Sequence, residues 1–304
     1  MAKHFLHIGL LLAVSALALK ASFMPPRMRA TLRPGESAVL EDSVLVLKGF
    51  TVPKYSDGRP RQYVSDVHLV THGAEGSPEA QHATISVNHP MRWRGWWINQ
   101  SAYDAEHEAY TVLEAVRDPF LPLAAAGGIL LLIGAALLCR RARHRAVVGV
   151  GASRVPSAVR FVAATALVMV PLWIAGRVLL TRELVPALQS PLLVPHVGAY
   201  IVAYAILIFA AFGIGVRLVP FGFFLMTLAL VLGATWGKIC WGDWWQYDPK
   251  EMWSLATWLT FAAYFHVRRP ALAKGVLWLG AVMIVLTLTW VNFAKMFKGL
   301  HAYV

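Results

Sequence analysis

Apolar residues gather in seven long runs along the chain, and polar residues separate the runs. A transmembrane helix needs roughly 20 mostly apolar residues, and each run approaches that length. This pattern predicts an all-α polytopic membrane protein with about seven transmembrane helices. The runs cover about 5–23, 120–139, 159–180, 196–216, 219–239, 252–267 and 275–293.

The first run has two interpretations. MAKHFLHIGLLLAVSALALKASFMPP has a basic start, an apolar centre and small residues, which are also typical of a cleavable signal peptide. No small-x-small cleavage site precedes a clearly polar mature start. We therefore expect an uncleaved transmembrane anchor over residues 1–23, with a cleaved signal peptide as the alternative.

A polar insertion over residues 24–119 separates the first two runs. Within it, SVLVLKGFTV, QYVSDVHLVT and HATISV have the composition of β-strands, and YSDGRPR is typical of a turn between the first two. The insertion is therefore predicted to form a small β-rich domain. A lid or spacer without its own activity is the alternative interpretation of this domain, because β structure alone does not indicate a chemical function.

The composition agrees with a membrane protein, and the charges give its orientation. The 304 residues are 58% hydrophobic and 14% charged, with a net charge of +12. The connection at 140–160 holds six arginines and the turn at 266–274 holds three basic residues, and neither holds an acid. Short basic loops mark the cytoplasmic side, so the N-terminus is predicted inside and the C-terminus outside.

This topology explains the positive charge without nucleic acid as a partner, since the basic residues follow membrane sides and form no single soluble face. Every Asp and Glu falls in a segment predicted to face outward, or at its edge. We expect a multi-pass plasma (inner) membrane protein in contact with lipid. Its residues 24–119, its C-terminus and the segment 236–258 would lie on the extracytoplasmic side.

Segment 236–258 is unusually rich in aromatic residues. An aromatic belt at a membrane interface accounts for one or two rings at a helix end, and this segment has seven, together with the glycines Gly237 and Gly242 and a DPKE cluster. Stacking faces, polar edges and a backbone that permits close approach suit a large flat ligand such as a porphyrin. The rings are Trp236, Trp241, Trp244, Trp245, Tyr247, Trp253 and Trp258.

This segment resembles the WWD signature of heme-handling proteins, and in particular that of the CcsA/ResC branch. Tyr247 stands where that family usually has Trp. The Tyr side chain retains a stacking face and adds a hydroxyl. Asp248 has two interpretations, as a residue that orients a histidine or as the cap of a helix that starts near Pro249. The matching residues are Trp241, Gly242, Trp245, Asp248, Pro249, Lys250, Glu251 and Trp253.

A second resemblance concerns residues 85–104, ISVNHPMRWRGWWINQSAYD. They are similar to the end of the extracytoplasmic domain of ResB/CcsB, a subunit of cytochrome c maturation. That family usually has several spans before this point, whereas only one is predicted here. The chain therefore resembles a shortened ResB/CcsB-like part fused to a CcsA/ResC-like part.

Histidines are the candidate ligands of heme iron. His196 opens the fourth run and His301 lies in the C-terminal tail, both on the predicted side of the tryptophan segment. A lone histidine at a helix end is often only a cap or a solvated residue. PHVGAYIVAY and KGLHAY resemble the two external heme-ligand motifs of CcsA, however, so the resemblance implies His196 and His301 as axial ligands.

A second histidine pair is expected near the cytoplasmic side. His266 ends the sixth run, where an ionisable residue is a functional candidate, and the family resemblance associates this histidine with heme inside the membrane. His7, or less favourably His4, on the first run lies at similar depth. A plain interfacial role is the alternative for His7.

Together the resemblances imply heme b as the bound group and thioether attachment to CxxCH cysteines of apocytochrome c as the activity, with the chain as a component of a holocytochrome c synthase. A ResB/CcsB-like subunit and thiol-reducing thioredoxin-like proteins are the implied partners. The alternatives are a heme or porphyrin exporter without ligation activity and a non-heme membrane assembly factor. The expected division is an anchor (1–23), a ResB-like extracytoplasmic domain (24–119), a helix with a basic cytoplasmic linker (120–158) and a CcsA-like domain (159–304). The expected cofactor-binding residues are Trp236, Trp241, Gly242, Trp245, Tyr247, Asp248, Trp253, His7, His196, His266 and His301.

Overall fold

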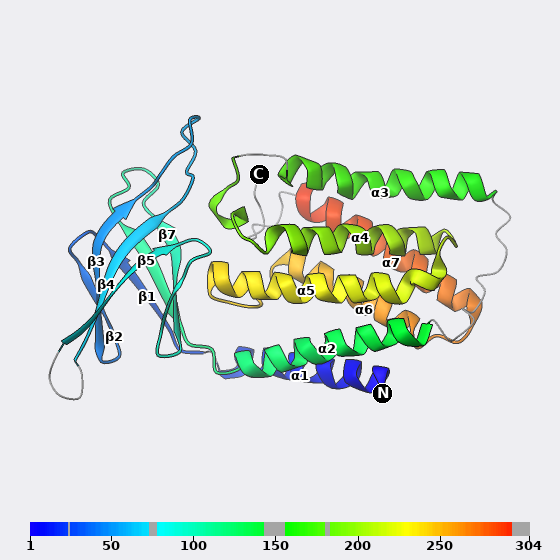
Figure 1. Ribbon diagram of the computed structural model, residues 1–304, viewed down its shortest axis with the longest axis horizontal. Coiled ribbons are helices and arrows are strands. Elements are labelled where there is room, and N and C mark those ends of the chain that lie inside the picture. The colour runs from blue at the N-terminus through cyan, green and yellow to red at the C-terminus, as the bar shows by residue number, and fades with distance from the viewer. Residues whose placement is uncertain (24, 73–77, 143–155, 180–182, 294–304) are drawn as a thin grey trace.

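The computed structural model describes residues 1–23, 25–72, 78–142, 156–179 and 183–293. A β-rich region lies at one end of a bundle of helices that run along the long axis of the molecule (Figure 1). The chain enters the β-rich region from the first helix and leaves it into the second. The predicted β-rich insertion is therefore confirmed.

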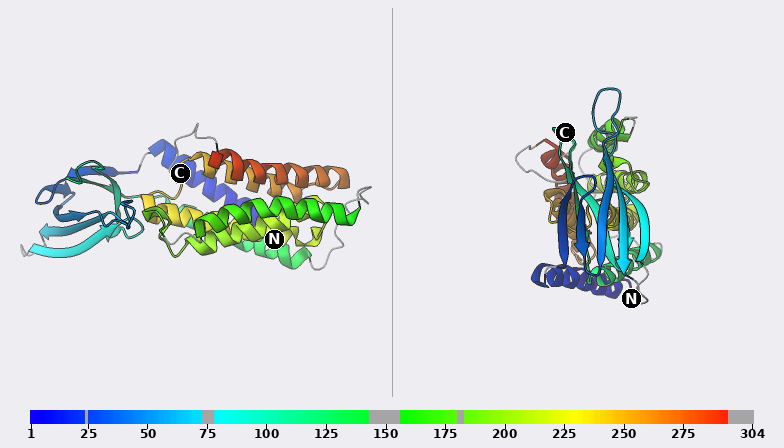
Figure 2. Two further views of the ribbon diagram at one scale, coloured as in Figure 1. Left: turned by 90° about the horizontal axis from the view of Figure 1, so that it is seen from above. Right: turned by 90° about the vertical axis from the view of Figure 1, so that its left-hand side faces the viewer.

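The β-rich region contains two antiparallel four-stranded sheets (Figure 2). Side chains alternate along β3, so that Leu45 and Leu47 are buried and pair with Leu69 and Val67 of β4. Buried residues of both sheets form one apolar core, as alternating strand patterns require. One sheet has the order β1 (Arg27–Leu32), β8 (Thr111–Val116), β7 (Trp96–Tyr103), β6 (Met91–Trp93), and the other β2 (Ser37–Leu40), β3 (Ser43–Thr51), β4 (Val64–His72), β5 (Pro78–Ser86).

Each of the seven apolar runs falls on an α-helix. The first helix opens the chain, and the next three follow the β-rich region. Of the last three helices, the first two carry the tryptophan segment. They are α1 (Ala2–Phe23), α2 (Leu121–Ala142), α3 (Ser157–Leu179), α4 (Leu193–Ala211), α5 (Val219–Trp241), α6 (Pro249–Tyr264) and α7 (Pro270–Phe293).

Five helices in the described part of the chain are long and apolar enough to cross a membrane. They correspond to α1, α2, α4, α5 and α7. The apolar stretch assessed in α3 is the shorter Ser157–Met169, and α6 has 16 residues. A polytopic membrane protein is therefore confirmed, while seven crossings and the N-inside, C-outside orientation stay predictions.

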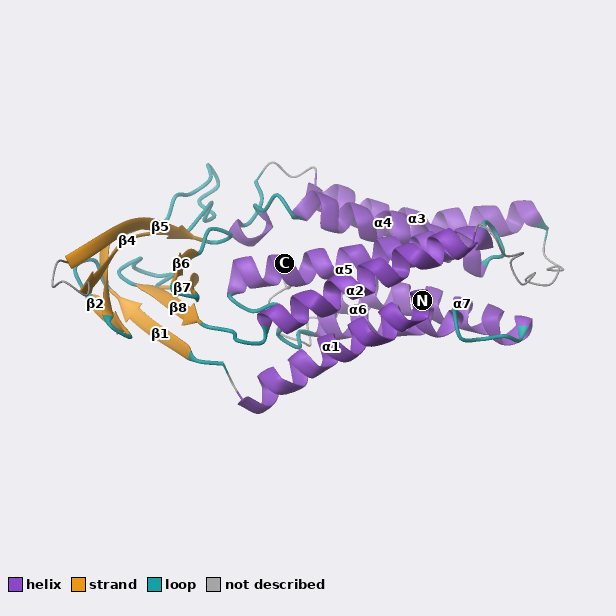
Figure 3. Ribbon diagram, turned by 60° about the horizontal axis from the view of Figure 1, so that its bottom comes forward, coloured by secondary structure: helices purple, strands orange, loops and turns teal. Residues whose placement is uncertain are grey.

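Glycines bring α1 and α2 into close contact (Figure 3). A Cβ atom on Gly9 would lie 2.8 Å from the backbone nitrogen of Leu131, and one on Gly127 would lie 2.8 Å from that of Ala13. Lipid gives no hydrophobic drive between helices, so membrane helices associate where small residues let their backbones pack closely. These contacts fix α1 along α2.

Replacement of Gly127 by Ala is expected to destabilise the bundle, because the added methyl group would overlap the backbone of Ala13. Overpacking of this kind costs about 1–3 kcal/mol. Gly275→Ala is the control, since nothing lies within 4 Å of a Cβ at that helical position. Thermal unfolding in detergent should show a lower midpoint for Gly127→Ala alone, and equal midpoints would contradict this packing.

Candidate functional site

Two helix ends hold the tryptophan segment in place. α5 ends at Gly242, whose φ of 80° is left-handed and whose N–H donates to the carbonyl of Lys238 at 3.1 Å. α6 begins after Asp248, which accepts from the Lys250 N–H at 2.9 Å and forms a capping box with Glu251. Asp248 therefore caps α6, the structural alternative that the sequence left open.

Several of the tryptophans are committed to the protein itself. Trp258 is 2% exposed, and its indole N–H donates to the Thr227 hydroxyl at 2.9 Å. The indole N–H of Trp244 donates to Asp118 at 3.0 Å. Trp258 is therefore a core residue, and the aromatic count of the sequence overstates the number of rings that face a ligand.

Trp241, Trp245 and Tyr247 line a cleft of about 350 Å³ between the tryptophan segment and the β-rich region, whereas Trp236 and Trp253 do not line it. Small-molecule sites usually measure about 300–1,000 Å³, so this cleft has room for part of a large flat ligand. Tyr247 is 50% exposed beside it. The lining residues are Lys20, Arg27, Asn99, Gln100, Ser101, Glu114, Trp241, Asp243, Trp245, Gln246 and Tyr247.

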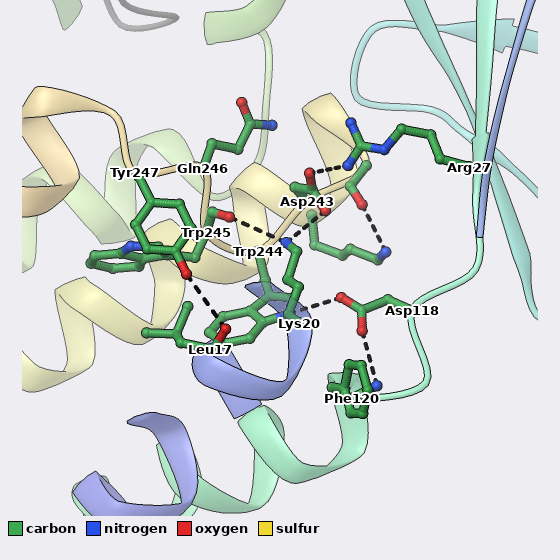
Figure 4. A network of polar contacts seen from close by, with 12 residues as sticks. Leu17, Lys20, Arg27, Asp118, Phe120, Asp243, Trp244, Trp245, Gln246 and Tyr247 are labelled. Carbon is green, nitrogen blue, oxygen red and sulfur yellow. Dashed lines mark hydrogen bonds and ion pairs between the residues drawn. The ribbon is translucent and has the colours of Figure 1, made fainter. Parts of the chain in front are cut away.

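A network of charges forms one wall of this cleft (Figure 4). The Asp243 carboxylate accepts from the Lys20 ammonium at 2.7 Å and from the Arg27 guanidinium at 2.5 Å. Arg27 also pairs with Glu114 at 2.9 Å. Burial alone would raise the pKa of Asp243, but hydrogen bonds and charge from Lys20 and Arg27 hold that pKa below its ordinary value.

His196 lies on the first turn of α4, beside Trp236. Its Nδ1 donates to the carbonyl of Ala229 at 2.8 Å, so in the neutral ring Nε2 carries the lone pair. Its ring meets Trp236 edge-on, with centroids 5.7 Å apart. A Cβ on Gly233 would lie 2.6 Å from the His196 ring, so the imidazole occupies space that this glycine leaves. His301 lies outside the described residues.

Asn88 holds Trp236 in this position and was missed from the sequence. Its side-chain oxygen accepts from the Trp236 indole N–H at 3.0 Å. Its side-chain nitrogen donates to the carbonyls of Pro186, Ala187 and Gln189 at 3.0–3.1 Å. The sequence signal was the Asn-His-Pro run, which is typical of a turn, and the structure shows a left-handed φ of 70° at Asn88.

At the other end of α1, the structure brings His7 and His266 together. Their Nε2 atoms lie 3.0 Å apart and their ring centroids 5.3 Å apart. The centroids can be this much further apart than the nitrogens only if both Nε2 atoms lie on the line that joins the two centroids. The rings therefore meet end to end. The Nδ1 of His266 lies 3.1 Å from the carbonyl of Ala262, so each ring presents Nε2 to the other.

His7 and His266 place two imidazole donors close together. Among the described residues no group of three or more His, Cys, Asp or Glu side chains is placed to hold a metal ion. A porphyrin supplies four ring nitrogens, so two axial imidazoles complete its iron. The His7–His266 pair meets that requirement in its donor atoms.

Comparisons with known proteins match two separate segments of the chain. Residues 3–109 match the ResB-like family, and residues 213–301 match the family described as cytochrome C assembly protein. The chain thus carries one segment that is similar to each of these two families. We call residues 3–109 the ResB-like part and residues 213–301 the assembly part.

Curated relatives agree over the second segment. A cytochrome c biogenesis protein CcsA of Guillardia theta is 43% identical over 95 residues, which are 29% of this chain and 30% of that protein. CcsA of Porphyra purpurea is 42% identical over 29% of this chain and 28% of its own length, and CcsA of Gloeobacter violaceus 43% identical over 29% and 27%. The chain thus spans less than a third of these relatives.

The two parts meet at both ends of α1. His7 of the ResB-like part faces His266 of the assembly part, and Lys20 of the ResB-like part faces Asp243 of the assembly part. The sequence analysis missed the second contact, because no motif links Lys20 to Asp243. Its signals were a lysine at the outer end of the first apolar run and an acid between two tryptophans.

Trp258 and Tyr247 should differ sharply in their effect on stability. Trp258→Ala is expected to cost about 3–5 kcal/mol, because it removes a buried ring and leaves a cavity. Tyr247→Ala is expected to change the free energy of unfolding little, since half of that residue is exposed. Thermal unfolding of both variants in detergent measures this. A comparable loss for Tyr247→Ala would contradict its placement in the cleft.

Proposed function

We propose that this chain binds heme as its substrate and presents it on the extracytoplasmic side for attachment to the CxxCH cysteines of apocytochrome c. The two matches support a role in cytochrome c maturation, the process for which the CcsA relatives are named. The observation that carries the proposal for heme is the end-to-end pairing of His7 and His266 across the two parts. Both rings are exposed, so a flat ligand reaches them without disruption of the helix core.

The two Nε2 atoms of this pair must move apart to form a bis-histidine site. Bonds between imidazole nitrogen and a metal are about 2 Å long, so two ligands of one iron lie about 4 Å apart. The observed 3.0 Å is shorter, and a small rotation of one exposed side chain makes up the difference. The His266 Nδ1 contact with a backbone carbonyl orients the ring, as is usual for metal-bound histidines.

On the outer side we propose His196 and His301 as the axial ligands, and Trp241, Trp245 and Tyr247 as residues that contact the porphyrin, although His196 does not itself line their cleft. His196 has the tautomer that ligation needs, because its Nδ1 donates to Ala229. Thioether attachment adds a cysteine S–H across a heme vinyl group and requires no net oxidant, so both thiols must arrive reduced. The contribution of the chain is to hold the vinyl group and the thiol in one geometry.

The remaining proposals concern the setting of this reaction. We propose seven crossings of the plasma (inner) membrane with the N-terminus inside, and the four-part division predicted from the sequence. Heme b is the proposed substrate form. Thiol-reducing thioredoxin-like proteins and a further ResB/CcsB-like subunit are the proposed partners.

Loss of either member of the inner pair should remove a heme signal. Wild-type protein purified in detergent is expected to show a low-spin bis-histidine absorption spectrum, and His7→Ala and His266→Ala are expected to lower the heme bound per chain. His4→Ala, also exposed on α1, is the matched control and should leave the spectrum unchanged. A wild-type chain without heme would favour a non-heme assembly factor.

The outer site is tested by crowding His196 without removing it. Gly233→Ala places a methyl group against the imidazole, whereas Gly198→Ala on α4 meets nothing within 4 Å. In a host that lacks its own maturation system, covalent heme on a co-expressed apocytochrome c should fall with Gly233→Ala alone. Heme binding without any covalent product from the wild type would favour an exporter.

A further inference from the structure

The proposed heme ligands do not explain the charge network of Lys20, Arg27, Asp243 and Glu114. We call these four residues the Asp243 network. Asp243 and Lys20 are each 9% exposed in their side chains, so both charges are removed from bulk water. Buried charges are costly unless they are paired and hydrogen-bonded. Here one carboxylate satisfies two cations, through separate oxygens.

The network joins elements that are distant in the sequence. Lys20 is on the last turn of α1 and Arg27 is on β1, both in the ResB-like part, while Asp243 lies between α5 and α6 in the assembly part. Through Arg27 the network extends to Glu114 on β8. It therefore ties the tryptophan segment to a helix and to a sheet.

Lys20 also fixes the neighbouring aromatic residues. Its ammonium donates to the backbone carbonyl of Trp245 at 3.2 Å and lies 5.4 Å from the ring centroid of Trp244. Trp245 lines the same cleft as Lys20, Arg27 and Asp243. The charges and the aromatic wall of the cleft are thus held by one set of contacts.

We propose that Asp243 is a positioning residue that fixes the tryptophan segment against Lys20 and Arg27, so that the outer cleft is complete only when the ResB-like and assembly parts are joined. The identity of the ligand in the cleft rests on the proposed function. The positioning role of Asp243 rests on the observed contacts alone. Asp243 itself touches no reacting atom in this account. Its effect passes through the backbone at Trp245.

The test compares Asp243→Asn with wild type in the full chain. Hydrogen–deuterium exchange of the peptide over 242–248 is expected to become on the order of tenfold faster, because a buried ion pair is broken. Exchange in β3 and β4 should not change. Asp243→Glu, which keeps the charge, should recover much of the protection, and Asp42→Asn, which removes a surface pair with Arg94, is the control.

Two further measurements separate positioning from plain stability. Heme transfer to apocytochrome c should fall with Asp243→Asn while the His7–His266 heme signal remains, which a general loss of fold would not give. The increase in exchange rate in the double variant Lys20→Met, Asp243→Asn should be smaller than the sum of the two single effects, since both substitutions break the same contact. Unchanged exchange at 242–248 in Asp243→Asn would overturn the positioning role. If the wild type binds no heme, the proposed function fails while the exchange result still decides this inference.

Discussion

The placement of α1 constrains both candidate sites. Close glycine contacts hold α1 along α2, and α1 carries His7 near one end and Lys20 near the other. These two residues are separated by about 20 Å of helix at 1.5 Å per residue. A shift or rotation of α1 would therefore change the pairing of His7 with His266 and the contact of Lys20 with Asp243 together.

This arrangement gives a physical reason for the union of the two matched parts in one chain. Neither the histidine pair nor the charge network belongs to one part alone. The inner pair is exposed at the surface of the bundle, whereas Lys20 and Asp243 of the outer network are buried at the junction with the β-rich region. The first arrangement suits entry of a flat ligand, and the second suits a fixed wall against which a ligand is held.

Local pattern was enough to predict much of the fold. The apolar runs predicted the helices, strand-like composition predicted the long strands, and the DPKE sequence allowed a helix cap that the structure shows at Asp248. The proximity of His7 to His266 followed from equal depth in the membrane. The roles of individual tryptophans did not follow, because burial of Trp258 against Thr227 depends on how α5 packs on α6. Asn88 and Asp243 act through contacts across distant segments, which spacing along the chain does not encode.

We propose that heme iron is held between His7 and His266. Cryo-electron microscopy of the heme-loaded chain in lipid nanodiscs tests it most directly. Flat density is expected between α1 and α6, with the two imidazoles on opposite faces and their Nε2 atoms further apart than the present 3.0 Å. Heme density elsewhere, with His7 and His266 still in direct contact, would contradict it.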